Sequence, residues 1–486
     1  MINSVVECPL PSLVAGEMHS NPSSDTEVEC ISFKEKPIMS KGRILKNLFV
    51  LNFFFCLFYT GFWALTNLQS TMNAKSGMGP DSQAVIYLFS MFSSLFLPEL
   101  MTDKFGCKTV IIVSTFICLP YIASNMYLRW DTFMISSALY GLGSGPFSAA
   151  QTIYIDELAT RFQGQVTENI EFIMACFFGV YTFFMENTQV WGNAVSSWVL
   201  QPDKHVHVNF SRRALCGVHF ELHGNETNTN LIPPTESARV WLVSIYVIMG
   251  LLALIFWIIF LDPLKNDIKE GNGCSTVSDR IRGSLKHFVT PQQLLLIPIT
   301  IYMGLESAFY SNDYTEAYIA CSWGVHHVGF VTVCFGVCGA LMSLLVGPLV
   351  KCISQMAVLI LAACANVSVC IVLYLWQPSP DFPPAYFIIA GVWGMGDAIW
   401  WSQVTALYGL MFPNDREAAF SNLYFWSFLG FFLSYSYANY FTVAVKINIL
   451  LCFLVTGMIG YLIGQIKIKC APAVTEYVTI PNSEDE

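Results

Sequence analysis

Charged residues are scarce in this sequence. Of its 486 residues only 12% are Asp, Glu, Lys or Arg, whereas 54% are hydrophobic and the mean hydropathy is +0.53. A soluble core does not account for this balance. Runs of about 20 residues with little or no charge, the length that crosses a bilayer as a helix, recur along most of the chain. The scarcity of charge therefore excludes a soluble protein and indicates a polytopic membrane protein.

The sequence also lacks the features of several other classes. Its first 46 residues are polar and contain no apolar run that a cleavable signal peptide requires. The net charge is −10, and no basic stripe with interleaved aromatics appears. There is no G-x-S-x-G elbow, H-E-x-x-H, Walker loop or paired-cysteine zinc spacing. We therefore expect no enzyme, no cofactor, no metal site and no nucleic-acid partner.

The apolar runs predict the fold class. In a bilayer each span must satisfy its own backbone hydrogen bonds, and these runs are too long for barrel strands, which leaves helices. We predict an all-α polytopic membrane protein with twelve transmembrane helices, the fifth tilted or broken near Glu186 and Asn187. The predicted spans are 47–69, 81–101, 108–127, 132–155, 169–200, 238–261, 292–318, 324–346, 355–376, 383–411, 418–440 and 446–465.

Basic residues predict the orientation, because Lys and Arg in short loops are retained in the cytoplasm. Most of the 24 Lys and Arg fall in inner segments if both termini are cytoplasmic. This places the long loop 201–237 outside. Two N-glycosylation acceptors, Asn209 and Asn225, lie in that loop and agree with this orientation.

Cysteines and histidines in the outer segments suggest further features. Most of the 16 cysteines lie inside apolar runs, where they act as small packing residues. Cys216 and Cys321 are predicted on the oxidising side, which makes them a candidate disulfide. Four histidines also lie in loop 201–237. Without a fixed ligand spacing we interpret them as loop residues rather than metal ligands.

A polar stretch divides the spans into two sets of six, the layout of transporters built from two parallel repeats. Spans four and ten then correspond, and they contain the similar stretches "YGLGSGPFSAAQ" and "VWGMGDAIWWSQ". We interpret Gly141 and Gly145 of the first stretch as a close-packing pair. The predicted divisions are a disordered cytoplasmic N-terminal tail 1–46, a first half 47–261, a cytoplasmic connector 262–291, a second half 292–465 and a cytoplasmic C-terminal tail 466–486.

Two acidic residues lie near the middle of predicted spans. At 1.5 Å per residue, Glu306 in span seven and Asp397 in span ten each lie roughly 21 Å along a helix. Trp393 and Trp401, four residues before and after Asp397, share its helical face. Together these residues form a candidate intramembrane site for a cation or a proton. The alternative is that each acid is protonated and hydrogen-bonded within the bundle, with the tryptophans as packing.

The segment after span two, "DKFGCK", resembles the cytoplasmic loop signature of the major facilitator superfamily. Asp103, Lys104, Gly106 and Lys108 fit that pattern, whereas Glu99 stands where it has a glycine. The resemblance implies a charge network and a tight turn between the second and third spans. The equivalent loop of the second half, "GPLVKCISQ", keeps little of the signature, which argues against rapid transporter-like cycling.

Several segments together resemble the Unc-ninety-three family, a branch of the major facilitator superfamily, and its A-type members in particular. The likeness covers roughly residues 45 to 465. It is found in "NLQSTMN", "LFLPELMTDKFGCK", "GLGSGPFSAAQTIY", "VWGNAVSSWVL", "YMGLESAFYSNDYTEAYIACSWG", "VWGMGDAIW" and "EAAFSN". In that family Asp397 falls in a G-x-x-D step and Glu306 in a G-L-[EQ] step, where some members have Gln. The Gln alternative favours a hydrogen-bonding role for Glu306.

The resemblance implies a regulator rather than an enzyme. The founding nematode member is regarded as a regulatory subunit of a two-pore potassium channel. A vertebrate B-type relative escorts Toll-like receptors from the endoplasmic reticulum to endosomes. We therefore expect a bilayer-embedded regulator that binds a potassium channel subunit, in the plasma membrane. The alternatives are a proton- or cation-coupled transporter of a small solute, a trafficking chaperone for membrane receptors, and an endosomal or endoplasmic reticulum location.

Overall fold

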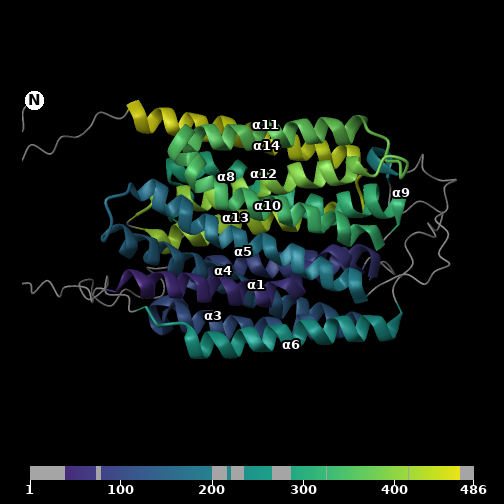
Figure 1. Ribbon diagram of the computed structural model, residues 1–486, viewed down its shortest axis with the longest axis horizontal. Helices are drawn as coiled ribbons and strands as arrows, with labels where there is room; N and C mark the ends of the chain where they lie inside the picture. Colours follow the sequence, from purple (N-terminus) through teal and green to yellow (C-terminus); the bar gives the residue numbers. More distant parts are fainter. Residues whose placement is uncertain are drawn as a thin grey trace, which may run out of the picture. The chain divides into compact units, whose positions relative to one another are not determined.

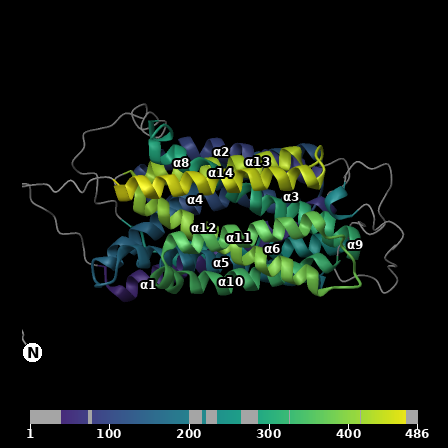
Figure 2. The same ribbon diagram turned by 90° about the horizontal axis from the view of Figure 1, so that it is seen from above.

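The computed structural model describes residues 39–72, 78–199, 216–220, 235–264, 286–324, 326–413 and 415–470. In these ranges the chain is built from helices, with no β-strand. The predicted all-α class is therefore confirmed. Long helices run side by side along one common direction, as Figures 1 and 2 show.

Each of the twelve predicted spans corresponds to one long helical segment of the described chain, although the second, 81–101, also includes the first residues of α3. The seventh segment is composite, because α8, the π-helix η5 and the short α9 follow one another without a gap. The bounds are α1 (Lys41–Met72), α2 (Met78–Phe96), α3 (Pro98–Ser124), α4 (Trp130–Gln163), α5 (Ile170–Val199), α6 (Glu236–Phe260), α8 (Pro291–Ala308), η5 (Phe309–Ala320), α9 (Cys321–Trp323), α10 (His326–Ile353), α11 (Gln355–Leu375), α12 (Pro384–Met411), α13 (Arg416–Tyr437) and α14 (Val443–Cys470).

Composition separates these segments into two kinds. Among the described residues, eight helical segments are long and apolar enough to cross a membrane, judged by length and composition alone. The helices α2, α4, α12 and α13 are not among them, since they are richer in Gly, Ser, Tyr and Trp. In α4 and α12 most residues are buried against other helices. These more polar helices therefore form much of the interior.

Helices from the two ends of the chain meet in the centre. The first six segments contact the last six mainly where α2 packs on α13 and where α5 packs on α10 and α12. In Figure 1, α3 and α6 lie at one edge and α11 and α14 at the opposite edge. The division at 262–291 into two halves agrees with this arrangement and stays a prediction. Residues 265–285 of that connector lie outside the described ranges.

Three details of the helices differ from the expected ones. Helix α5 runs without a break through Glu186 and Asn187. The Asn187 side chain donates to the carbonyl of Phe183 at 2.8 Å, and Glu186 is buried, so neither residue interrupts the helix to reach water. Helix α1 begins at Lys41, inside the predicted disordered tail, and α14 continues to Cys470, inside the predicted C-terminal tail.

Gly141 and Gly145 lie where α4 packs closely on α2. A Cβ atom at Gly145 would overlap Ser93 and Ser94 of α2. The Ser93 hydroxyl donates to the carbonyl of Gly141 at 2.8 Å, a hydrogen bond that the close approach permits. These contacts agree with the close-packing interpretation of the pair.

The signature segment contains a sharp turn at Gly106 between two helical pieces that together form α3. Helix α3 begins at Pro98 and bends at Gly106, whose φ is 76° and ψ 153°. Ser354 has nearly the same conformation, with φ 79° and ψ 152°, between α10 and α11. The second half therefore makes a similar turn without a glycine. This backbone region is open to glycine and strained for other residues.

We expect Ser354→Gly to stabilise the protein. Removing the side chain relieves the strain at positive φ, so the free energy of unfolding should rise by about 1 kcal/mol, measured by thermal denaturation of the purified protein. The matched reverse change is Gly106→Ser. It should lower stability by about 1–3 kcal/mol, although an added Cβ there meets no neighbouring atom. If both variants are as stable as the wild type, the backbone at Ser354 and at Gly106 is unstrained.

Candidate functional site

Asp397 lies in the middle of α12 and is 3% exposed. The Ser307 hydroxyl of α8 donates to its carboxylate at 2.8 Å. Trp401 in turn donates its indole N–H to the oxygen of Ser307 at 3.1 Å. A serine that accepts one hydrogen bond and donates another therefore fixes the carboxyl group.

Glu306 is adjacent to Ser307 and fully buried. The Asn366 side-chain amide of α11 donates to Glu306 at 3.3 Å and to the hydroxyl of Tyr302 at 2.6 Å. The Ser307 hydroxyl lies 3.5 Å from Glu306, so its single proton is better placed for Asp397. The structure thus brings the two predicted acids together around one serine.

Sequence reasoning missed a third acid at this place. Glu186 of α5 is 1% exposed and lies close enough to Asp397 for the two carboxyl groups to interact electrostatically. Neither oxygen of Glu186 accepts a hydrogen bond from an N–H or O–H group of the described residues, so only a proton shared with Asp397 could join it to a neighbour. The available signal was an acid near the centre of a long apolar span, the same signal that singled out Glu306.

A glycine leaves the room that Glu186 occupies. Gly339 of α10 faces α5, and a Cβ atom at this position would lie 2.6 Å from the carboxyl carbon of Glu186. Such a contact is too close for any real side chain. A side chain at residue 339 would therefore push the carboxyl end of Glu186 out of its present position.

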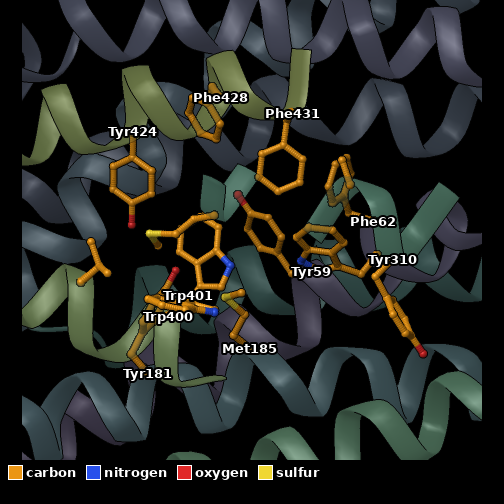
Figure 3. Packing of buried hydrophobic residues seen from close by; sticks show 14 of the residues in the cluster. Tyr59, Phe62, Tyr181, Met185, Tyr310, Trp400, Trp401, Tyr424, Phe428 and Phe431 are labelled. Atoms are coloured by element: carbon orange, nitrogen blue, oxygen red, sulfur yellow. The ribbon is translucent and has the colours of Figure 1, made fainter. Parts of the chain in front are cut away.

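Two adjoining cavities lie beside these acids. The smaller has about 20 Å³ accessible to the centres of water-sized molecules, room for about one water, and Glu186 and Asp397 line it. The larger has about 60 Å³ and is lined mainly by aromatic rings. Figure 3 shows side chains of Tyr59, Phe431 and Trp401 gathered around this part of the core. Trp63 and Met185 line both cavities and so form their common wall.

The two predicted tryptophans have different surroundings. Trp393 is fully buried and stacks on Phe309, with ring centroids 5.5 Å apart, and it lines neither cavity. Trp401 lines the larger cavity and is hydrogen-bonded to Ser307. Of the two, Trp401 is therefore the one placed to contact a ligand beside Asp397.

The remaining predicted residues lie away from these cavities. Lys108 donates to the carbonyl of Ile258 at 2.9 Å, and the Lys104 ammonium lies 5.4 Å from the ring of Phe105. Asp103 and Gly106 lie in α3 with them. The acceptors Asn209 and Asn225 fall outside the described residues. No group of three or more His, Cys, Asp or Glu in the described chain could hold a metal ion.

Covalent and ionic contacts join the first six segments to the last six at both ends of the bundle. Cys216, between α5 and α6, forms a disulfide with Cys321 of α9. These are the two cysteines that the sequence analysis predicted as a candidate disulfide on the outer side. At the opposite end, the guanidinium of Arg416 lies 2.6 Å from the buried carboxylate of Asp156. The Lys351 ammonium lies 2.9 Å from Glu168 on the same side.

A further ion pair holds the beginning of α1 against the end of α6. Arg43 donates to Asp262 at 2.7 Å, and Lys46 and Asn47 donate to the same carboxylate. Partial burial acts to raise the pKa of Asp262, but these hydrogen bonds outweigh it and hold the pKa well below its usual range. The carboxylate is therefore charged at neutral pH, and the contact is present there.

Comparisons with known proteins agree on one family. A family model described as "Ion channel regulatory protein UNC-93" matches residues 69–462. Unc-93 homolog A of Xenopus laevis is 36% identical, over 86% of this chain and 92% of that protein. The human homolog A is 31% identical, over 86% and 93%. A Caenorhabditis elegans protein, named as a candidate potassium channel regulatory protein unc-93, is 28% identical, over 88% of this chain and 62% of that protein.

Solved structures show the fold that this chain shares. The fucose:proton symporter of Escherichia coli superposes with a TM-score of 0.59 at 13% identity, over 87% of this chain and 99% of that chain. The human organic anion transporter MFSD10 superposes with a TM-score of 0.56 at 10% identity, over 87% and 99%. The fold is therefore that of the major facilitator superfamily, as the signature segment suggested.

We expect Glu186→Met to raise the thermal stability of the purified protein. A carboxyl group that is buried without a hydrogen bond costs about 1–3 kcal/mol, and Met of similar length does not incur this cost. The contrasting variant is Asp156→Ala, because Asp156 is a buried acid with a cationic partner. Its loss removes the nearest carboxylate from Arg416, whose other acidic neighbour, Glu157, lies 4.0 Å away, and should destabilise by about 3 kcal/mol. If Glu186→Met destabilises as much as Asp156→Ala, Glu186 has a stabilising partner and the site is misassigned.

Proposed function

Because the chain belongs to the UNC-93 family, we propose that it is a non-enzymatic, multi-pass membrane regulator that binds a potassium channel complex and modulates its conductance. The description of the family as ion channel regulatory proteins supports this proposal. The name of the Caenorhabditis elegans relative supports the choice of a potassium channel. The lipid bilayer and a channel subunit are the proposed partners.

The contacts at the two ends of the bundle favour a binding partner over a rapidly cycling carrier. Alternating access in transporters rocks one set of helices against the other. Here the Cys216–Cys321 disulfide connects the two sets at one end, and the Asp156–Arg416 and Lys351–Glu168 ion pairs connect them at the other. A scaffold held at both ends can present a constant surface to a channel.

We place the protein in the plasma membrane with both termini in the cytoplasm. The distribution of Lys and Arg supports this orientation, as do the acceptors Asn209 and Asn225 in the loop assigned outside. A disulfide at Cys216 agrees with an oxidising outer side. Modulation of membrane conductance requires residence with the channel, which favours the plasma membrane over endosomes or the endoplasmic reticulum.

The central acids favour a second candidate function, proton- or cation-coupled transport of a small solute. Acids inside a membrane bundle are costly and mark ion or substrate pathways in many transporters. Glu186 comes from the first six segments, whereas Glu306 and Asp397 come from the last six. A ligand or proton between Glu186 and Asp397 would therefore contact both sets of helices.

Channel binding is tested by co-expression with individual two-pore potassium channel subunits. We expect the tagged protein to co-purify with at least one subunit and to change its whole-cell potassium current. The control is a twelve-helix transporter from outside the family, expressed at the same level. If no subunit co-purifies and every current is unchanged, the regulator proposal fails.

Transport is tested with the purified protein alone in liposomes. If the second candidate is correct, an imposed proton or potassium gradient drives a measurable flux of that ion through the wild-type protein. Asp397→Asn should reduce this flux at least tenfold, because the amide has no acidic proton to exchange and no negative charge. A folded wild-type protein without flux would exclude this candidate, and flux that persists in Asp397→Asn would remove the proposed role of the aspartate.

A further inference from the structure

The two cavities together have the two kinds of wall that an organic cation requires. At the smaller cavity the polar groups of the lining are the carboxyl groups of Glu186 and Asp397, the amide of Gln189, and the hydroxyls of Ser307, Ser311 and Tyr310. Across Trp63 and Met185 the larger cavity is bordered mainly by aromatic rings, together with Ile86, Ser144 and Ser148. A positive head group would find matching surroundings in the smaller cavity, and an apolar body would find them in the larger cavity beside it.

The acidic end has no positive charge of its own. No Lys, Arg or His lines either cavity. The ammonium of Lys446 is already paired with Asp313. Glu186 is 1% exposed, lines the small cavity and accepts no hydrogen bond from an N–H or O–H group of the described residues, while the carboxyl group of Asp397 lies close enough to share a proton with it. A buried carboxylate in this situation requires a counter-ion or a proton.

The aromatic end favours an organic cation over a metal ion. Faces of Trp, Tyr and Phe attract ammonium groups and also pack against alkyl carbons. Trp401 has its N–H occupied by Ser307, and Tyr424 has its hydroxyl occupied by Thr152. What these two residues add to the cavity is therefore mainly ring surface. As noted, the described chain contains no cluster suited to a metal ion.

Size limits the ligand. A cavity holds one water when the space accessible to the centre of a water-sized molecule is roughly 10–15 Å³. The small cavity therefore has room for about one ammonium group, and the larger, of about 60 Å³, for about four to six carbon atoms.

We infer that the two adjoining cavities bind a small alkylammonium ion, with its nitrogen between Glu186 and Asp397 and its carbon atoms among the aromatic rings on the side of Trp63 and Met185. The inference deepens the second candidate function by naming the class of solute. Binding can nevertheless be measured on the protein alone. A negative binding result and an absence of flux are therefore separate outcomes.

The test is isothermal titration calorimetry of the full chain in lipid nanodiscs with tert-butylammonium and with tert-butanol. The two compounds have nearly the same shape and differ in charge. We expect the ammonium to bind at least tenfold more tightly than the alcohol, and saturating ammonium to raise the Tm. Equal binding of the two compounds, or binding of neither, would overturn the inference without any variant being needed.

The variant test uses Glu186→Gln and a matched control. Glu186→Gln should weaken tert-butylammonium binding at least tenfold and leave the weaker binding of tert-butanol unchanged. The control is Glu316→Gln, the same substitution at another buried acid that lines neither cavity and also has an oxygen without a hydrogen bond. It should change binding less than threefold. Equal losses in both variants would refute the assignment to Glu186.

Discussion

The position of the central acids inside a membrane bundle imposes the constraint on which the surrounding structure depends. A charged acid at the middle of a span costs about 3 kcal/mol or more when it faces lipid, so each must point inward. Three such acids from α5, α8 and α12 meet here. Ser307 connects two of them, Asn366 holds one, and Gly339 leaves space for the third. The neighbouring helices therefore place hydrogen-bonding or small residues next to the carboxyl groups.

The sequence was sufficient for the helices and for part of the site. Apolar windows located the spans because a bilayer requires about 20 apolar residues per crossing. Glu306 and Asp397 were identifiable because acids are rare in such windows. Glu186 met the same criterion but was interpreted as a break, since Asn187 follows it and the span is long. Its role depends on contact between α5 and α12, which spacing along one helix does not reveal.

Other details also depend on contacts between helices. Trp393 and Trp401 are equally spaced from Asp397, yet one packs on Phe309 and the other is hydrogen-bonded to Ser307. Their partners come from neighbouring segments, so helical periodicity alone cannot separate them. Likewise, Gly106 suggests a turn by its identity, whereas Ser354 makes nearly the same turn with a residue that rarely adopts it.

The absence of a Cβ atom at Gly339 limits which pairs of residues can occupy positions 339 and 186 in relatives of this protein. A chain with alanine or any larger residue at this position must move the carboxyl end of Glu186, which lies 2.6 Å from where the added Cβ would stand. Because the side chain of glutamate is flexible, the acid can be kept, but its carboxyl group leaves its present position. The two positions should therefore co-vary among homologues, and a relative with a larger residue in place of the glycine should hold any acid at position 186 in a different place.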